Sequence, residues 1–266
     1  MTSTIPVVVL AFNKHEVTQC CIDSIVENTS EAHRVVLVDN GSTPVFEENP
    51  RYDLVRLENN LFYTKGINAG IRYVLRHYPD FESIVLLNND VVVNPGWLKA
   101  LIKERNGNPG VIGNKHFLLD NPNEIIHAGT ADLIGGIHKG GPDPELFNEV
   151  SHEVWVTFAC AMITRPCLDA VGLLDERMEH FYSDNDFCLR ALMAGFDVLF
   201  EPESTIYHAH NLSYKETTIS VDPDRDIYIK KWLGHDLVNK IFNRILLDYE
   251  QKQLLIFNRE IVSKAP

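Results

Sequence analysis

Residues 83–93 read SIVLLNNDVVV, an apolar run interrupted in its middle by Asn88, Asn89 and Asp90. A short apolar run bounded by polar residues is typical of a strand that is buried on both faces of a sheet. Burying three polar side chains without partners costs about 1–3 kcal/mol per group. We therefore expect this triplet at the rim of the sheet, where the strand emerges, or bound to a ligand.

Two similar runs precede this one, IPVVVLAF at 5–12 and RVVLVD at 34–39, and helix-like segments at 14–28 and about 67–77 separate the three runs. Strands that alternate with helices predict an α/β fold, with a mostly parallel central sheet and helices on both faces. Ligands of such sheets bind beyond the carboxyl ends of the strands. The residues to inspect are therefore those that end the runs: Asn13, Asp39, Asn40 and the 88–90 triplet.

The pattern becomes looser from about residue 106. Residues 129–144 contain five glycines and two prolines, which predicts a long connection. An acceptor-side flap and a plain surface loop explain this segment equally well. Further elements are expected after it: strands at 154–163, 197–202 and 204–210, a helix at 184–194, and a helical tail at 222–258.

We interpret the chain as one catalytic domain, 1–266, because no linker divides it. Within that domain the regular alternating pattern of 1–105 is followed by the looser pattern of 106–220. The helical tail, 221–266, completes the predicted domain.

The composition excludes some classes of function. A formal net charge of -13 argues against binding to nucleic acid or to an anionic bilayer through general positive potential. Five cysteines without a CxxC pair are typical of reduced cytosolic thiols and make a zinc site an unfavoured interpretation. No apolar run reaches the roughly 18 residues of a membrane span, and 5–12 resembles a buried strand more than a signal peptide. We expect a cytoplasmic protein that meets any membrane-borne acceptor from the inner surface.

Two acidic residues end predicted strands. Asp90 is a hard oxygen ligand that suits Mg²⁺ or Mn²⁺ shared with a diphosphate, although a simple Asn-Asn-Asp turn also explains the triplet. Asp39 is followed by Asn40, Gly41 and Ser42. Its carboxylate either accepts a hydrogen bond from a nucleobase or ribose, or closes an Asx-turn that holds the loop.

Lys65 and Gly66 precede Asn68 and Gly70 in the segment NNLFYTKGINAG, at the expected beginning of a helix. Backbone N–H groups and a lysine in that position can meet a phosphate or a ribose. The chain contains neither GxGxxG after its first strand nor GxxxxGK[ST]. A dinucleotide-binding fold and a P-loop are therefore not supported.

Residues 180–196 read HFYSDNDFCLRALMAGF, where Ser183 and Asp186 have the spacing of a capping box. Asp184 is then left for chemistry, as a carboxylate that the helix dipole keeps ionised and that can act as a general base; simple stabilisation of the helix is the alternative. His208 and His210 follow a strand-like run and share one face. One of them can complete a metal site with Asp90, and the structural alternative is a histidine that does not bind metal.

Taken in order, these motifs resemble family 2 of the inverting glycosyltransferases with the GT-A fold, especially the rhamnosyltransferase-like branch. The match extends from about residue 5 to 213, and RDIYIKKWLG at 225–234 resembles the usual ending of that family. The motifs are AFN at 11–13, VDNGS at 38–42, NLFYTKGINAG at 60–70, NND at 88–90, FACA at 158–161, VGLLDE at 171–176, YSDNDFCLR at 182–190 and IYH at 206–208.

The resemblance implies a nucleotide-binding half at 1–105, an acceptor and catalytic half at 106–220, and a role for each matching residue. Asp39 would contact the nucleobase, Asp90 the metal, Asp184 would be the catalytic base, and His208 would approach the metal or the diphosphate. The remaining donor-binding residues that it implies are Ala11, Asn13, Lys65, Asn68, Asn88 and Asn89.

The implied activity is Mn²⁺- or Mg²⁺-dependent inverting transfer of a sugar from a nucleoside-diphosphate donor to a glycan or lipid-linked glycan, in the assembly of surface polysaccharide. Three positions depart from the family pattern. Asn88 replaces the first Asp of the metal triplet, Ser183 replaces a Glu before the base, and Cys160 replaces a Gly near the donor pocket.

Two other classes of protein remain open. A sugar-1-phosphate nucleotidyltransferase has a related sheet, but it needs a glycine-rich loop after the first strand, and LAFNKHE at 10–16 has no glycine. A non-catalytic sugar-nucleotide or glycan-binding module is the third class. Retention of both Asp90 and Asp184 argues against it.

Overall fold

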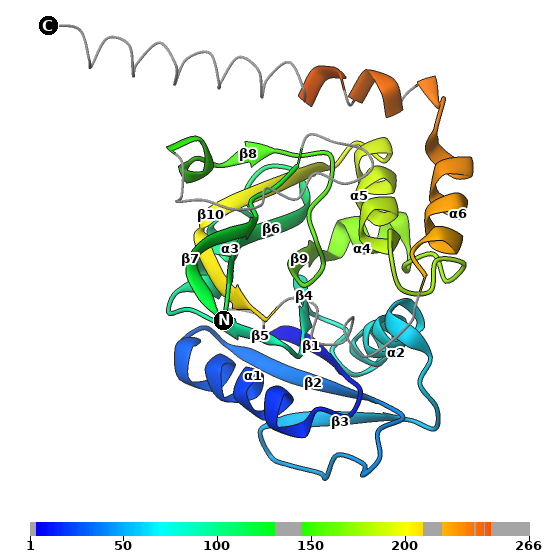
Figure 1. Cartoon of the computed structure of the whole chain (residues 1–266). Helices are drawn as coiled ribbons and strands as arrows, with labels where there is room; N and C mark the ends of the chain where they lie inside the picture. The colour runs from blue at the N-terminus through cyan, green and yellow to red at the C-terminus, as the bar shows by residue number, and fades with distance from the viewer. Residues whose placement is uncertain (1–3, 131–144, 210–219, 237, 242, 246–266) are drawn as a thin grey trace, which may run out of the picture.

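The computed structural model describes residues 4–130, 145–209, 220–236, 238–241 and 243–245 (Figure 1). His210, most of the glycine-rich 129–144 segment and the predicted helical tail beyond 245 lie outside the described residues.

A ten-stranded sheet runs through the molecule in the order β3-β2-β1-β4-β9-β6-β10-β5, with β7 on β6 and β8 on β10. Its strands are β1 (Ile5–Ala11), β2 (His33–Asn40), β3 (Tyr52–Leu57), β4 (Ser83–Asn88), β5 (Val91–Val93), β6 (Pro109–Leu118), β7 (Asn121–His127), β8 (Ser151–His152), β9 (Cys160–Thr164) and β10 (Asp197–His208). The helices are α1 (His15–Asn28), α2 (Phe62–His77), α3 (Trp97–Lys103), α4 (Arg165–Val171), α5 (Ser183–Met193) and α6 (Asp222–Trp232), with a short 3-10 turn, η1 (Glu145–Asn148).

The first four strands of the sheet, β3, β2, β1 and β4, are parallel, as the βαβ pattern predicts. Beyond them the sheet is mixed, because β9 runs antiparallel to both β4 and β6, whereas β10 runs parallel to β6. Buried strands are apolar in either direction, so the pattern of β9 alone did not reveal its reversal.

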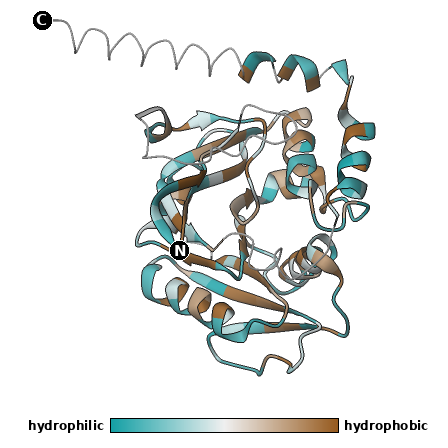
Figure 2. Ribbon diagram, viewed as in Figure 1, coloured by the Kyte–Doolittle hydropathy of each residue, from teal (hydrophilic) through white to brown (hydrophobic). Residues whose placement is uncertain are grey.

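Helices cover both faces of the sheet, which confirms the predicted α/β architecture. Alternate residues of β1 point to opposite faces: Val8 packs in the core beneath α2, α4, α5 and α6, and Val9 in the core beneath α1 and α3. The central strands are correspondingly the most apolar part of the molecule (Figure 2).

Helix α2 begins at Phe62, five residues before the predicted position, and lies very close to the sheet. A Cβ atom at Gly70 would lie 2.5 Å from Cγ1 of Val8 and 2.9 Å from Cγ2 of Val38. A Cβ at Gly66 would lie 2.6 Å from Cδ1 of Leu10. These glycines therefore allow the close approach of α2 to β1 and β2.

The strand register gathers the predicted polar residues at one edge. Ala11 lies opposite Asp39, and Leu10 lies opposite Asn88, so the carboxyl ends of β1, β2 and β4 coincide. In the described part of the chain, no helix is long and apolar enough to span a bilayer.

Candidate active site

The two predicted metal ligands meet at the carboxyl edge of the sheet, although 118 positions separate them in the chain. The Nε2 atom of His208 lies 3.0 Å from Oδ1 of Asp90. The reason is the pairing of β10 with β5, which places His208 opposite Val91, the residue after Asp90. The backbone N–H of Ala209 also donates to the carbonyl oxygen of Asp90 at 3.0 Å.

This pair can supply two ligands to a divalent cation. One carboxylate oxygen and one imidazole nitrogen are ligands that Mn²⁺ accepts, and both side chains keep some exposure, 12% for Asp90 and 10% for His208. Within the described ranges, no group of three or more His, Cys, Asp or Glu side chains is arranged to hold a metal ion. A diphosphate or water can supply further oxygen ligands to a cation bound by these two residues.

The other two members of the triplet anchor the turn. The side-chain amide of Asn89 donates to the hydroxyl of Thr18 in α1 at 2.9 Å. The backbone N–H of Asn88 donates to the carbonyl oxygen of Ala159 at 2.9 Å. The turn is thus tied to α1 on one side and to the segment before β9 on the other.

Asp184 contacts that same segment before β9. It is the second residue of α5, and its Oδ2 atom accepts a hydrogen bond from the backbone N–H of Phe158 at 3.4 Å. Its Oδ1 atom accepts from the backbone N–H of Asn185 at 2.9 Å. Because Phe158 and Ala159 are adjacent, the 88–90 turn and Asp184 flank one dipeptide at this edge of the sheet.

Burial raises the pKa of the Asp184 carboxyl above its ordinary value, and the N–H donors of Asn185 and Phe158 oppose that rise. The helix dipole was expected to keep this carboxylate ionised, but the cost of removing the charge from water has the larger effect on the pKa. A carboxylate with a raised pKa accepts a proton more readily. This property is required of a general base.

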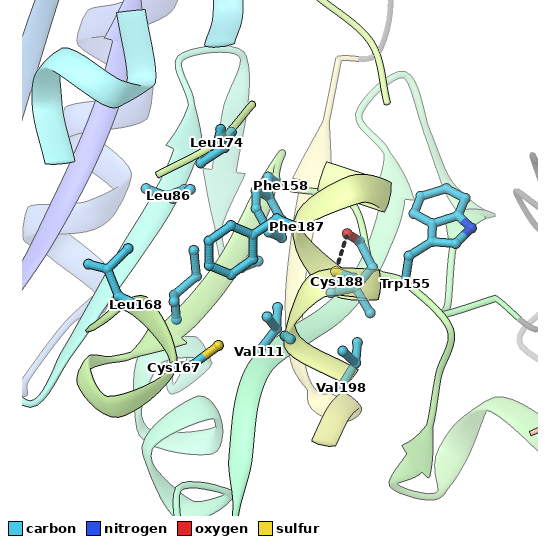
Figure 3. Close-up of a cluster of buried hydrophobic side chains, with 14 of the residues drawn as sticks. Leu86, Val111, Trp155, Phe158, Cys167, Leu168, Leu174, Phe187, Cys188 and Val198 are labelled. Carbon is cyan, nitrogen blue, oxygen red and sulfur yellow. Dashed lines mark hydrogen bonds between the residues drawn. The ribbon is translucent and has the colours of Figure 1, made fainter. Parts of the chain in front are cut away.

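The residues of α5 that face the sheet hold Asp184 at this edge. Phe187 packs against Phe158 with ring centroids 5.6 Å apart, and the thiol of Cys188 lies 3.9 Å from the carbonyl oxygen of Val156 (Figure 3). The segment that carries the Phe158 N–H donor is therefore packed directly on the helix that carries the carboxylate.

The predicted capping box is wrong. Helix α5 starts at Ser183 itself, its N-cap residue is Tyr182, and no side chain caps it. Asp186 is instead fully buried and binds Arg190 at 2.8 Å and the indole N–H of Trp232 at 2.8 Å. Those partners satisfy the carboxylate more fully than one backbone N–H would.

Asp39 and Asn13 organise the loop after β2. The Asp39 carboxylate is fully buried and accepts from the backbone N–H groups of Ser42 at 2.9 Å and Phe46 at 3.0 Å. Asn13 accepts from the N–H of Thr43 at 2.9 Å through its side chain, and its own N–H donates to the Ser42 hydroxyl at 2.8 Å. These hydrogen bonds match the loop-holding interpretation of Asp39, and the guanidinium of Arg56 in β3 also lies 3.7 Å from its carboxylate.

The remaining predicted donor residues differ in exposure. Ala11 is buried where β1 ends. Lys65 is partly exposed and lies 3.6 Å from the Glu179 carboxylate. Asn68 is fully buried, and its amide donates to the carbonyl of Leu174 and accepts from the N–H of the same residue, at 2.9 Å and 3.0 Å. The Asn68 side chain therefore holds the 174–176 segment against α2.

Tyr63 and His116 lie beside the site and were missed by sequence reasoning. The Tyr63 hydroxyl donates to the Phe158 carbonyl at 3.1 Å, and burial together with the negative charge of Asp184 raises its pKa. The His116 ring lies 5.9 Å from the His208 ring, edge to face. Tyr63 stands within the NLFYTKG motif, so its position there was a usable signal. The sequence around His116 contains no motif that indicates a site residue.

Cys160 also lies near this edge, opposite Leu87 of β4. Its thiol accepts a hydrogen bond from the side-chain amide of Asn114 at 3.3 Å, and burial raises its pKa. A buried thiol with a raised pKa is a weak nucleophile. Cys160 is therefore a packing residue in this structure.

Comparisons with known proteins identify relatives of this chain. The chain is 25% identical over 260 residues to an O-antigen biosynthesis protein of Myxococcus xanthus, covering 88% of this chain and 20% of that protein. It is 23% identical over 238 residues to an N-acetylglucosaminyl-diphospho-decaprenol L-rhamnosyltransferase of Mycobacterium tuberculosis, covering 78% of this chain and 76% of that one. The chain spans less than a third of the length of the Myxococcus relative and of a Sinorhizobium fredii protein that it also matches.

The fold is shared with GT-A glycosyltransferases. A crystal structure of GalNAc-T7 with UDP, GalNAc and Mn²⁺ superposes with a TM-score of 0.66 at 16% identity, covering 85% of this chain and 48% of that one. The family model for glycosyl transferase family 2 matches residues 7–169, which is more than half of the chain and includes the triplet and β9. The chain belongs to glycosyl transferase family 2.

Proposed function

We propose that this protein transfers a sugar from a nucleoside-diphosphate donor to an acceptor hydroxyl with inversion at the anomeric carbon. One observation carries the proposal: Asp90 and His208 pair at 3.0 Å on the edge of the sheet where Asp184, a carboxylate with a raised pKa, is also held. Cation-binding and proton-accepting groups are the two that this reaction needs close together.

In the proposed reaction, Asp184 takes the proton of the acceptor hydroxyl while that oxygen forms its bond to the anomeric carbon. The bond between the anomeric carbon and the diphosphate breaks, and its electron pair leaves with the diphosphate. Attack from the face opposite the leaving group inverts the anomeric centre.

The proposed metal ligands on the protein are Asp90 and His208, with Mn²⁺ or Mg²⁺ as the cation. When bound, such a cation neutralises the negative charge of a departing diphosphate. The remaining donor contacts are assigned to Asn13, Asn88 and Lys65, and the loop that Asp39 holds is the proposed wall of the nucleobase site.

The relatives direct the choice of substrates. A rhamnosyl donor carried on thymidine diphosphate is the first donor to test, because a mycobacterial relative is an L-rhamnosyltransferase. A glycan or lipid-linked glycan of surface polysaccharide is the proposed acceptor, and the Myxococcus relative belongs to O-antigen biosynthesis. We place the reaction at the inner face of the membrane when the acceptor is lipid-linked.

The test is incubation of the protein with Mn²⁺ and a panel of nucleotide sugars. Expected results are release of nucleoside diphosphate, either by transfer or by slow donor hydrolysis, and an inverted anomeric configuration by NMR. Release of pyrophosphate from a nucleoside triphosphate and a sugar phosphate would instead identify a nucleotidyltransferase. Binding of nucleotide sugars without any turnover would refute the enzymatic proposal.

A further inference from the structure

Helix α6 presents three residues spaced four apart, Asp224, Tyr228 and Trp232, along one face. All three are buried, at 5%, 2% and 7% exposure, although the helix as a whole is strongly polar. Figure 1 shows α6 lying beside α5. From Asp224 to Trp232, the three residues contact successive parts of the chain: the segment before α5, the N-cap of α5, and the first turn of α5.

Asp224 binds the segment that leads into α5. Its carboxylate accepts hydrogen bonds from three consecutive backbone N–H groups, those of Glu179 at 3.0 Å, His180 at 2.8 Å and Phe181 at 2.8 Å. Successive N–H groups that converge on one anion form a strong, charge-assisted site with fixed geometry. This segment therefore has its path set by a side chain of α6.

Tyr228 packs on the next residue, Tyr182. The two rings are stacked, with centroids 5.1 Å apart and planes 22° apart. Tyr182 is the N-cap of α5 and has a φ of 61°, in the left-handed region that an L-residue rarely adopts. Such a conformation persists when surrounding contacts determine it, and the stacked ring supplies one of them.

Trp232 binds within the first turn of α5. Its indole N–H donates to Oδ1 of Asp186 at 2.8 Å, and Nζ of the adjacent Lys231 lies 2.6 Å from the same oxygen. Asp186 is fully buried, so these partners compensate for the loss of its hydration. Helix α6 thus contacts residues 179–182 on one side of Asp184 and Asp186 on the other.

We infer that α6 positions the proposed base, with Asp224, Tyr228 and Trp232 as positioning residues for the Asp184 carboxylate. This inference rests on the proposed function. The alternative is that α6 contributes stability alone. The two differ in a measurable way, since the proposed metal ligands Asp90 and His208 lie on other elements, and a positioning defect lowers kcat without changing the affinity for donor and cation.

The test compares Asp224→Asn with Asp222→Asn, a control on the exposed side of the same helix. Misplacement of a catalytic group by about 1 Å can cost about 100-fold in rate. We expect Asp224→Asn to lower kcat by about 10- to 100-fold while the Kd for nucleoside diphosphate with Mn²⁺ stays unchanged. Asp222→Asn should retain the kcat of the unmodified protein.

Trp232→Phe is the second variant, because it keeps an aromatic ring in the core but removes the N–H donor to Asp186. It should also lower kcat at unchanged donor affinity. Amide hydrogen exchange of 179–181 should become faster in Asp224→Asn and stay unchanged in Asp222→Asn. The inference is overturned if Asp224→Asn and Trp232→Phe each lower Tm but have the kcat of the unmodified protein at temperatures well below their Tm.

Failure of this inference is distinguishable from failure of the proposed function. If Asp184→Asn lowers kcat by about 100-fold or more but Asp224→Asn and Trp232→Phe do not lower it, only the positioning role is refuted. If Asp184→Asn turns over normally, the assignment of the base is refuted, and the positioning role that depends on it is refuted too.

Discussion

Replacing Asp184 with Asn tests the assignment of the base most directly. The change keeps the size of the side chain and removes its ability to accept a proton. The amide oxygen of Asn can still accept from the N–H of Asn185, whose bond is 2.9 Å, whereas the amide nitrogen cannot accept from the N–H of Phe158, which lies 3.4 Å from the carboxylate. A hydrogen bond to a charged group contributes about 1.5–3 kcal/mol at normal length and less at 3.4 Å, so the fold should be retained.

The effect on the rate should be much larger than the effect on the fold. A positioned general base contributes about 10²- to 10⁴-fold. That range corresponds to about 3–5 kcal/mol of activation free energy, at about 1.36 kcal/mol per tenfold. We expect kcat to fall by this amount while the Kd of the donor is unchanged, because the Asp90–His208 pair is intact.

The assay follows nucleoside diphosphate release at saturating donor, Mn²⁺ and acceptor, with donor affinity measured separately by calorimetry. Asp23→Asn, a partly exposed carboxylate paired with Arg51, is the matched control. A kcat for Asp184→Asn within threefold of the control would refute the reasoning. Equal loss of kcat and of donor binding would also refute it, since the residue would then act in the donor site.

The pH dependence should report the same carboxyl. Because burial raises the Asp184 pKa, kcat should rise with pH through a value above the ordinary Asp pKa of about 3.9, and Asp184→Asn should lack that rise. The folded protein binds this proton more tightly than the unfolded chain, so the carboxyl lowers stability as pH rises from the ordinary value through the raised one. Asp184→Asn should therefore have a higher Tm than the unmodified protein at neutral pH and no such gain at acidic pH.

Three further changes test the metal pair and the packing. Asp90→Ala should abolish the Mn²⁺-dependent stabilisation by nucleoside diphosphate, which is about 2.7 kcal/mol at a ligand concentration of 100 times Kd. In the same thermal-shift assay, Glu27→Ala at an exposed position should keep this stabilisation. Asn68→Ala should lower the free energy of unfolding, measured in urea, by about 1–3 kcal/mol for each buried backbone group of Leu174 left unpaired. The control is Asn123→Ala at an exposed position, and an equally small change in both variants would contradict the holding role of Asn68. Gly70→Ala should destabilise by about 1–3 kcal/mol through overpacking against β1, and stabilisation typical of an exposed helical glycine would contradict the close approach of α2.

Much of the site could be predicted because it lies where strands end. The runs that end near Asn13, Asp39 and the 88–90 triplet are recognisable from local polarity alone, and parallel strands bring such ends to one edge. The structure places them at that edge, with Asp90 paired to His208. The roles of these residues in binding and catalysis remain predictions.

Other contacts of the site could not be predicted because the two partners lie far apart in the sequence. The spacing of Ser183 and Asp186 matches a capping box, yet Asp186 binds Trp232, which is 46 residues further along the chain. Asn68 stands in a motif that resembles a donor site, yet it binds a segment 106 residues away. Hydrogen-bond partners at such separations depend on how the elements pack, which local spacing does not encode.

The amino-acid sequence by itself determined the buried strands β1, β2 and β4, the helices that alternate with them, and the polar residues at the ends of those strands. These properties follow from the period of apolar residues along the chain, which is a short-range signal. Only the tertiary structure decided the reversed direction of β9, the burial that raises the Asp184 pKa, and the contacts of α6 around that residue. Those features depend on packing between elements far apart in the chain, since desolvation and hydrogen-bond partners are set by what surrounds a side chain in space.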